Sequence, residues 1–169
     1  MKQKRTDMRH LLLSLLLLPS LALADPYAEQ DYLALYAGYF DVTQDDGNNA
    51  LQLGLDYRFE PVYEGLRPAA GVNVTSDGAM YGYSGFFWDV FLTDQWLLTP
   101  NFVAGLYGRG DGKDLGSGVE FRSGIELSYQ FETGQRAGLQ FNHISNAGIG
   151  DSNIGAESLL LVFQQPVKW

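Results

Sequence analysis

Three residues near the carboxyl end of the chain have the types and spacing that nucleophilic catalysis requires: His143, Ser145 and Glu157. A serine hydroxyl is a weak nucleophile until a base removes its proton. Histidine can be that base near neutral pH, and a carboxylate can hold the imidazole in one tautomer and stabilise the imidazolium. The only other histidine, His10, lies in a segment with the features of an export signal, so any histidine-dependent chemistry of the exported protein uses His143.

The elements that must position these residues are two strands joined by a loop. His143 and Ser145 are two residues apart in a predicted strand, 136–145, so both side chains point to the same face. If the loop spans 146–154, Ser145 pairs with Gly155, and His143 then lies directly opposite Glu157. The Cβ atoms of such cross-strand partners are about 4.5–5.5 Å apart. The register therefore predicts that the carboxylate, the imidazole and the hydroxyl meet on one patch.

Alternation of apolar and polar residues with a period of two extends along the rest of the chain and is typical of strands with two different faces. It is clearest at 51–59 and 119–131. A set of about eight strands is predicted, the others lying near 32–40, 66–74, 80–92, 98–106, 136–145 and 157–163. Pro166 follows the last of these, and because proline lacks a ladder donor the strand is predicted to end or bulge before it.

The connections between these strands alternate in length and composition. Longer polar segments rich in Gly, Asp and Asn alternate with shorter turns, and the longer ones are 45–49, 75–79, 108–117 and 146–156. Long loops at one end and short turns at the other are typical of a transmembrane barrel. An even number of strands places both termini at the short-turn, periplasmic end.

Alternation alone does not show which face points inward, because a soluble lipocalin-like barrel has the same pattern with its apolar face inside. Three features favour the membrane. Small residues and both charge signs share the polar face, which suits the tight interior of a small barrel. Basic residues are few, and aromatic residues gather near strand ends, where interfacial girdles lie. The chain also ends on an aromatic residue, Trp169. The predicted fold is an all-β, eight-stranded antiparallel transmembrane barrel of the bacterial outer membrane.

The first residues resemble a secretory signal and are set aside from the fold. Basic residues come first, an apolar run follows at 11–18, and Ala22 and Ala24 provide the small residues of a cleavage site. The predicted domains are a signal peptide, 1–24, and one barrel domain, 25–169. The net charge of −9 argues against nucleic acid as a partner, and the absence of cysteine means that the exported fold does not depend on disulfides.

The segment His143-Ile-Ser-Asn-Ala-Gly148, followed by Asn153, Gly155 and Glu157, resembles the active-site signature of the lipid A 3-O-deacylase (PagL) family, whose members are often called acyloxyacyl hydrolases. The resemblance in detail covers about the last 30 residues. It implies Ser145 as nucleophile, His143 as general base and Glu157 as the acid that orients it. It also implies an oxyanion hole formed by Asn153 and the backbone N–H of Gly148, with Asn146 in support.

The implied reaction is hydrolysis of the ester that links a hydroxyacyl chain to the 3-position of lipid A. The substrate is lipid A or lipopolysaccharide, reached among outer-membrane lipids with the active site toward the outer leaflet. No metal and no organic cofactor is required.

Other interpretations stay open at this stage. A non-enzymatic barrel could act through its loops, a soluble carrier could hold an apolar ligand, and an enzyme of the same class could be a phospholipase or an acyltransferase. The acidic loop residues, such as Asp111 and Asp114, are interpreted as solvated charges rather than as a site for divalent cations. The sequence does not fix the oligomeric state, and a homodimer is compatible with it.

Overall fold

A computed structural model of the chain describes residues 29–44, 47 and 49–167. The predicted signal peptide, 1–24, and the terminal Trp169 lie outside the described residues. The signal peptide and the boundary of the domain 25–169 therefore stay predictions.

Long antiparallel strands make up nearly all of the described chain. Their bounds are β1 Asp31–Phe40, β2 Ala50–Arg58, β3 Leu66–Thr75, β4 Met80–Trp88, β5 Val90–Phe91, β6 Trp96–Gly108, β7 Val119–Gln130, β8 Arg136–Ser145 and β9 Ala156–Val167. β4 and the two-residue β5 both pair with β6 and are separated only by Asp89, so they act as one interrupted strand. The predicted segment 80–92 thus corresponds to β4 and β5 together.

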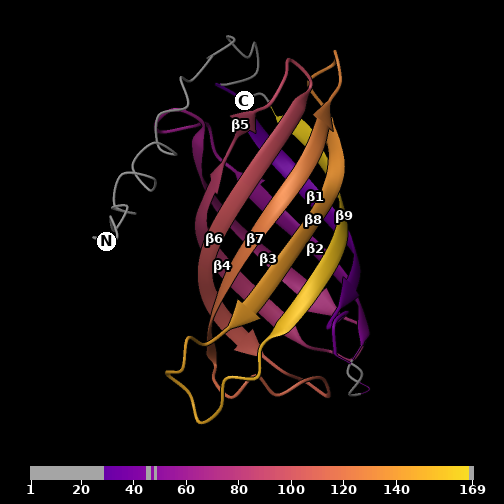
Figure 1. Cartoon of the computed structure of the whole chain (residues 1–169), viewed down its shortest axis with the longest axis vertical. Coiled ribbons are helices and arrows are strands. Elements are labelled where there is room, and N and C mark those ends of the chain that lie inside the picture. Colours follow the sequence, from indigo (N-terminus) through magenta and orange to yellow (C-terminus); the bar gives the residue numbers. More distant parts are fainter. Residues whose placement is uncertain (1–28, 45–46, 48, 168–169) are drawn as a thin grey trace, which may run out of the picture.

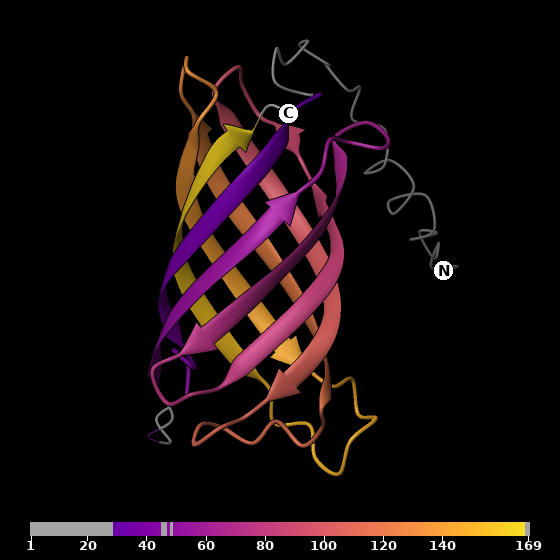
Figure 2. The ribbon, with the colours of Figure 1, turned by 180° about the vertical axis from the view of Figure 1, so that it is seen from behind.

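The strands close into a barrel. Each long strand pairs with the next long strand along the chain, so that β4 pairs with β6, and β9 returns to pair with β1. The eight long strands therefore form a ring (Figure 1). From behind, β1 to β4 cross the barrel at a steep tilt (Figure 2). Closure leaves no sheet edge, which is the condition for a β-structure in lipid. The predicted eight-stranded antiparallel barrel is confirmed.

The outer wall of the barrel is apolar. Leu106 and Leu161 are 71% and 66% exposed, and large apolar side chains at alternate positions of every long strand share this orientation. A soluble carrier would instead turn these residues into its interior. The orientation therefore excludes the soluble carrier and matches a barrel whose outer face meets lipid.

The barrel interior is polar, and three of its buried arginines, Arg58, Arg67 and Arg136, are paired with carboxylates. Arg58 is fully buried and donates to Glu126 at 2.7 Å and to Asp56 at 3.2 Å. At the end of the barrel where β1 begins, Asp89 accepts from Arg67 at 2.7 Å and from Arg136 at 2.6 Å. Buried ions persist only when they are paired and hydrogen-bonded in this way.

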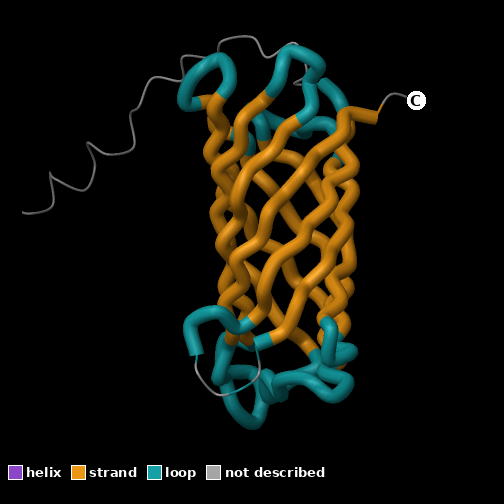
Figure 3. The backbone as a smooth tube through the Cα atoms, turned by 90° about the vertical axis from the view of Figure 1, so that its right-hand side faces the viewer, coloured by secondary structure: helices purple, strands orange, loops and turns teal. Residues whose placement is uncertain are grey.

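The connections differ between the two ends of the barrel (Figure 3). The segments 109–118 and 146–155 lie at the end where β6 and β8 finish, and β1 begins and β9 finishes at the opposite end, among short turns (Figure 1). This is the predicted layout of loops and termini. Within the described ranges, no helix is long and apolar enough to span a bilayer.

One expectation about the last strand is wrong. Pro166 was expected to end or bulge the strand before it, because proline lacks a ladder donor. Instead β9 continues to Val167, and Pro166 pairs in register with Tyr32 of β1. The pairing of β9 with β8 stops at Gln164, so Pro166 has a neighbouring strand on one side only, and there the missing N–H is tolerated.

Candidate active site

The centre of the site is a pair of residues on adjacent strands. His143 of β8 lies directly opposite Glu157 of β9, as the loop length predicts. His143 Nδ1 is 2.8 Å from Glu157 Oε1. A carboxylate can only accept, so Nδ1 carries the proton and donates it, and Nε2 is left with the lone pair that a general base needs. Both side chains lie on the outer face, with 45% of the imidazole and 19% of the carboxylate exposed.

The second oxygen of the Glu157 carboxylate also has a partner. Thr43 Oγ1, just beyond the end of β1, donates to Glu157 Oε2. The backbone N–H of Val42 donates to the Glu157 carbonyl oxygen at 3.0 Å, so the chain follows β9 for one more hydrogen bond after β1 ends. The carboxylate is therefore held from both oxygens.

Ser145 is the last residue of β8 and is half-buried on the same face as His143. Among the hydrogen bonds of the described residues, none joins Ser145 to His143. In enzymes without substrate, catalytic hydrogen bonds of this kind are often long and shorten when substrate binds. The strand thus places Ser145 on the same face as His143 and two residues further along, as the sequence predicts.

Asn146, the next residue, organises the loop 146–155. It is fully buried, and its Nδ2 donates to the carbonyl oxygens of Leu115 at 2.8 Å and Ser152 at 2.6 Å. Its Oδ1 accepts from the N–H of Gly148 at 2.9 Å. Asn146 therefore ties the loop 146–155 to itself and to the neighbouring loop 109–118.

The residues of the two expected oxyanion donors, Asn153 and Gly148, are both hydrogen-bonded to Asn146. The backbone N–H of Asn146 donates to Asn153 Oδ1 at 3.1 Å, so the amide of the exposed Asn153 is turned with its Nδ2 away from that bond. The N–H of Gly148 is bound to Asn146 Oδ1, and Gly148 has a positive φ of 78°. Asn153 Nδ2 is thus the more available donor, and the Gly148 N–H would be shared between Asn146 and an oxyanion.

Gly155 is packed against the imidazole. Its φ is +68°, in the region that favours glycine, and a Cβ at this position would lie 2.9 Å from His143 Cε1. Gly155 therefore both turns the chain into β9 and leaves room for the ring. The predicted register places Gly155 opposite Ser145, and its contact with the His143 ring follows from the same register.

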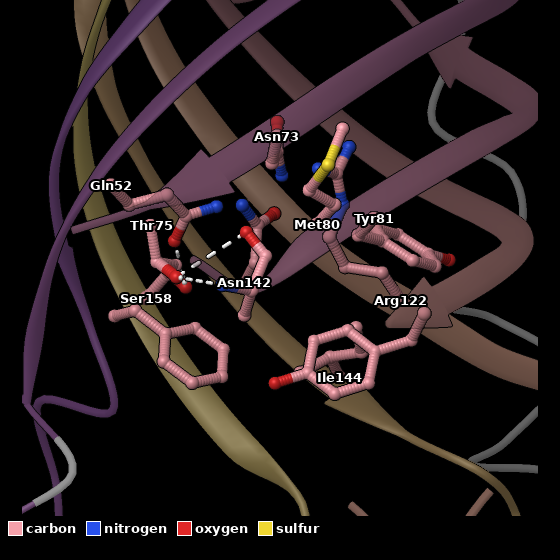
Figure 4. A pocket seen from close by; sticks show the side chains of 12 residues that line it. Gln52, Asn73, Thr75, Met80, Tyr81, Arg122, Asn142, Ile144 and Ser158 are labelled. Atoms are coloured by element: carbon pink, nitrogen blue, oxygen red, sulfur yellow. Dashed lines mark hydrogen bonds between the residues drawn. The ribbon is translucent and has the colours of Figure 1, made fainter. Parts of the chain in front are cut away.

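On the inner face of the same strands the barrel is filled with side chains (Figure 4). A cavity there of about 20 Å³ has Asn142, Ile144 and Ser158 among its lining residues, and Ser158 Oγ donates to Gln52 Oε1 at 2.8 Å. That volume holds about one water molecule. The inner face of these strands therefore has no room for a lipid chain, and the His143 side chain is accessible from the outer wall.

The model of the lipid A 3-O-deacylase (PagL) family matches residues 36–165, which include every residue of this site. The chain belongs to this family. A comparison with curated protein sequences gave no match. Membership in the lipid A 3-O-deacylase family confirms the family that the sequence resembles and, with the apolar outer wall, the expected localisation in the bacterial outer membrane.

Solved structures support the fold. The crystal structure of the outer membrane enzyme PagL is similar at a TM-score of 0.61 and 22% identity, over 80% of this chain and 99% of that one. A structure from the de novo design of transmembrane β-barrels is similar at a TM-score of 0.54 and 12% identity, over 82% of this chain and 96% of that one. At these identities the likeness concerns the barrel alone, which the designed protein shares.

Two residues from other loops, Thr43 and Lys113, support the site and were not predicted from the sequence. Thr43 binds Glu157 across 114 residues of sequence, and Lys113 of the loop 109–118 binds Asp41 at 2.6 Å. Neither contact has a local sequence signal. The only hint was the closure of the barrel, which requires its last strand to pair with its first and so places the end of β1 beside the start of β9.

Proposed function

We propose that this lipid A 3-O-deacylase family member hydrolyses the ester at the 3-position of lipid A with Ser145 as nucleophile, His143 as general base and Glu157 as orienting acid. The observation that carries the proposal is the 2.8 Å contact of His143 Nδ1 with Glu157 Oε1, on the outward face of the strand that ends in Ser145.

The reaction follows from the protonation state of the pair. His143 Nε2 takes the proton of Ser145 Oγ as the oxygen attacks the ester carbonyl carbon, and Glu157 stabilises the imidazolium. Collapse of the tetrahedral intermediate breaks the bond to the sugar oxygen, which takes the proton from His143, and leaves an acyl group on Ser145. A water molecule, deprotonated by His143, then releases the hydroxy fatty acid. These steps require no metal and no organic cofactor.

The developing oxyanion is stabilised by donors from the loop 146–155. Asn153 Nδ2 is the first of these, because Asn146 already holds the other end of the amide. The N–H of Gly148 is the second. Loss of one such donor typically costs about 2.7–4 kcal/mol of transition-state stabilisation.

The position of the site on the wall explains how a lipid becomes the substrate. His143 and Ser145 lie on the lipid-facing side, at the end of the barrel that carries the longer loops, which is the outer-leaflet end in this layout. Lipid A diffuses laterally to this position with its acyl chains still among lipids. The substrate therefore does not have to leave the membrane.

The test is mass spectrometry of lipid A from cells that make the protein or its Ser145→Ala variant at equal membrane abundance. Loss of one hydroxyacyl mass with the wild-type protein alone is expected. Loss with both proteins would refute Ser145 as nucleophile. Unchanged lipid A with both would refute lipid A as substrate, and release of fatty acid from phospholipid vesicles would then identify a phospholipase.

A further inference from the structure

The acid of the triad is held by a segment far from it in sequence. Glu157 uses Oε1 for His143 and Oε2 for Thr43. A carboxylate with a single partner can still turn about its own axis, whereas one that is bound through both oxygens has a fixed plane. The plane of the carboxylate sets the position of Oε1, and the hydrogen bond to Oε1 sets the orientation of the His143 imidazole relative to Ser145.

Thr43 is exposed and comes from a loop, so its own position needs an explanation. The residues on either side of it supply one. Asp41 Oδ2 accepts from Lys113 Nζ at 2.6 Å, and Gln44 Oε1 accepts from the same ammonium at 2.9 Å. Lys113 is thus bound on both sides of Thr43 and fixes the short segment between them.

Burial makes the ion pair between Lys113 and Asp41 a firmer attachment than a surface ion pair. The side chains of Lys113 and Asp41 are 3% and 0% exposed, although both residues belong to loops at the end of the barrel that carries the longer loops. Surface ion pairs contribute little to structure, but a buried pair cannot lose one partner without leaving an unpaired charge away from water. Asp41 also has a positive φ of 58°, an uncommon conformation for a residue other than glycine. The turn that directs Thr43 toward Glu157 is therefore maintained by the ion pair.

The segment 41–44 also contacts Gly155, the neighbour of the His143 ring. Gln44 Nε2 donates to the carbonyl oxygen of Gly155 at 3.3 Å, and Gly155 is the residue packed against the His143 ring. We propose that Thr43 is a positioning residue for Glu157, and that Asp41, Gln44 and Lys113 form a clasp that holds Thr43 in place. Lys113 brings the loop 109–118 into the catalytic apparatus without touching substrate.

This inference rests on the proposed function, since it assigns a role in the reaction of the same triad. It predicts that the hydroxyl of residue 43 affects turnover rather than substrate binding. Thr43→Val keeps the shape of the side chain and removes the donor, whereas Thr43→Ser keeps the donor. We expect Thr43→Val to lower kcat by roughly tenfold or more with KM within twofold of wild type, because an interaction that orients the catalytic groups acts on the chemical step. Thr43→Ser is expected to stay within about threefold of wild type.

The assay uses the folded full-length protein in mixed micelles of detergent and purified lipid A, with Ser145→Ala as the inactive reference. Thr133→Val is the matched control, because Thr133 lies in the short turn 131–135 at the opposite end of the barrel. Unheated gel migration confirms that each variant is a folded barrel. A kcat for Thr43→Val equal to that of Thr133→Val would overturn the inference. Equal losses in Thr43→Val and Thr43→Ser would also overturn it, because packing and not the hydroxyl would then be responsible.

The clasp is tested by combining Lys113→Met with Thr43→Val. If Lys113 acts through Thr43, Lys113→Met lowers kcat alone but adds less than about twofold in the Thr43→Val background. Full additivity would show that Lys113 acts by another route and would refute the clasp. A wild-type protein that leaves lipid A intact, or a Ser145→Ala variant that stays active, would contradict the proposed function itself and is distinguishable from these results.

Discussion

The contact between Gly155 and the His143 ring allows a backbone effect and a catalytic effect to be separated. An alanine at 155 must adopt a φ near +68°, which costs about 1–2 kcal/mol for a residue with a Cβ. Its Cβ would also lie 2.9 Å from His143 Cε1, well inside the optimum of about 3.5–4.0 Å between carbon atoms. The ring therefore has to move by roughly 0.5–1 Å, since the backbone of the two paired strands holds the alanine in place.

A displacement of about 1 Å in a catalytic group can cost on the order of 100-fold in rate. Gly155→Ala is expected to lower kcat by about that factor while the barrel still folds. Gly78→Ala is the matched control, because Gly78 has a φ of +85° and an added Cβ there would meet nothing within 4 Å. Both variants pay the same backbone cost, and only one moves His143.

The assay is lipid A deacylation by the two variants in detergent micelles, together with urea unfolding of each barrel in lipid vesicles. Similar losses of stability and a large loss of kcat only in Gly155→Ala are expected. If the kcat values of the two variants agree to within threefold, a Cβ at position 155 does not displace the His143 ring and the reasoning fails.

Three further predictions concern the support of the site and the orientation of the wall. Asn146→Ala removes the hydrogen-bond donor to two loop carbonyl oxygens, which costs about 1–3 kcal/mol for each buried group left unpaired. The variant should lower kcat strongly, because the loop 146–155 loses its attachment, and kcat and the free energy of unfolding are measured on one preparation. Asp89→Asn weakens the pairing of Arg67 and Arg136 and should cost about 3–5 kcal/mol of stability, read from urea unfolding, while kcat per folded molecule stays unchanged. Leu161→Arg places a charge on the lipid-facing wall and should cost about 2–4 kcal/mol in vesicles; a neutral effect would mean that this wall does not meet lipid.

Much of the fold follows from the sequence because a period of two is a local property. Strands such as 136–145 show it over their whole length, and the loop length between them and the next strand then fixes the register of His143 against Glu157. The face of each strand that points into the barrel could also be predicted, since small residues together with charges of both signs suit the inside of a narrow barrel. These signals need no knowledge of distant contacts.

The rest depends on contacts that no local pattern records. Thr43 reaches Glu157 only because β9 pairs with β1, and Lys113 reaches Asp41 only because two loops fold toward each other over the barrel end. Pro166 was predicted wrongly for a related reason: the cost of a proline depends on whether a second strand lies beside it, and the lengths of neighbouring strands are not visible in the sequence.

The filled interior of the barrel has a consequence for the cell that contains it. Throughout the described strands, the space that a wider barrel leaves to water is taken up by buried side chains such as Arg58, Arg136 and Gln140. Ions and small solutes then find no aqueous route through the protein, and a membrane crowded with copies keeps its permeability barrier and its electrical resistance. The amount of this enzyme in the outer membrane can therefore rise without opening a pore through the enzyme's own lumen.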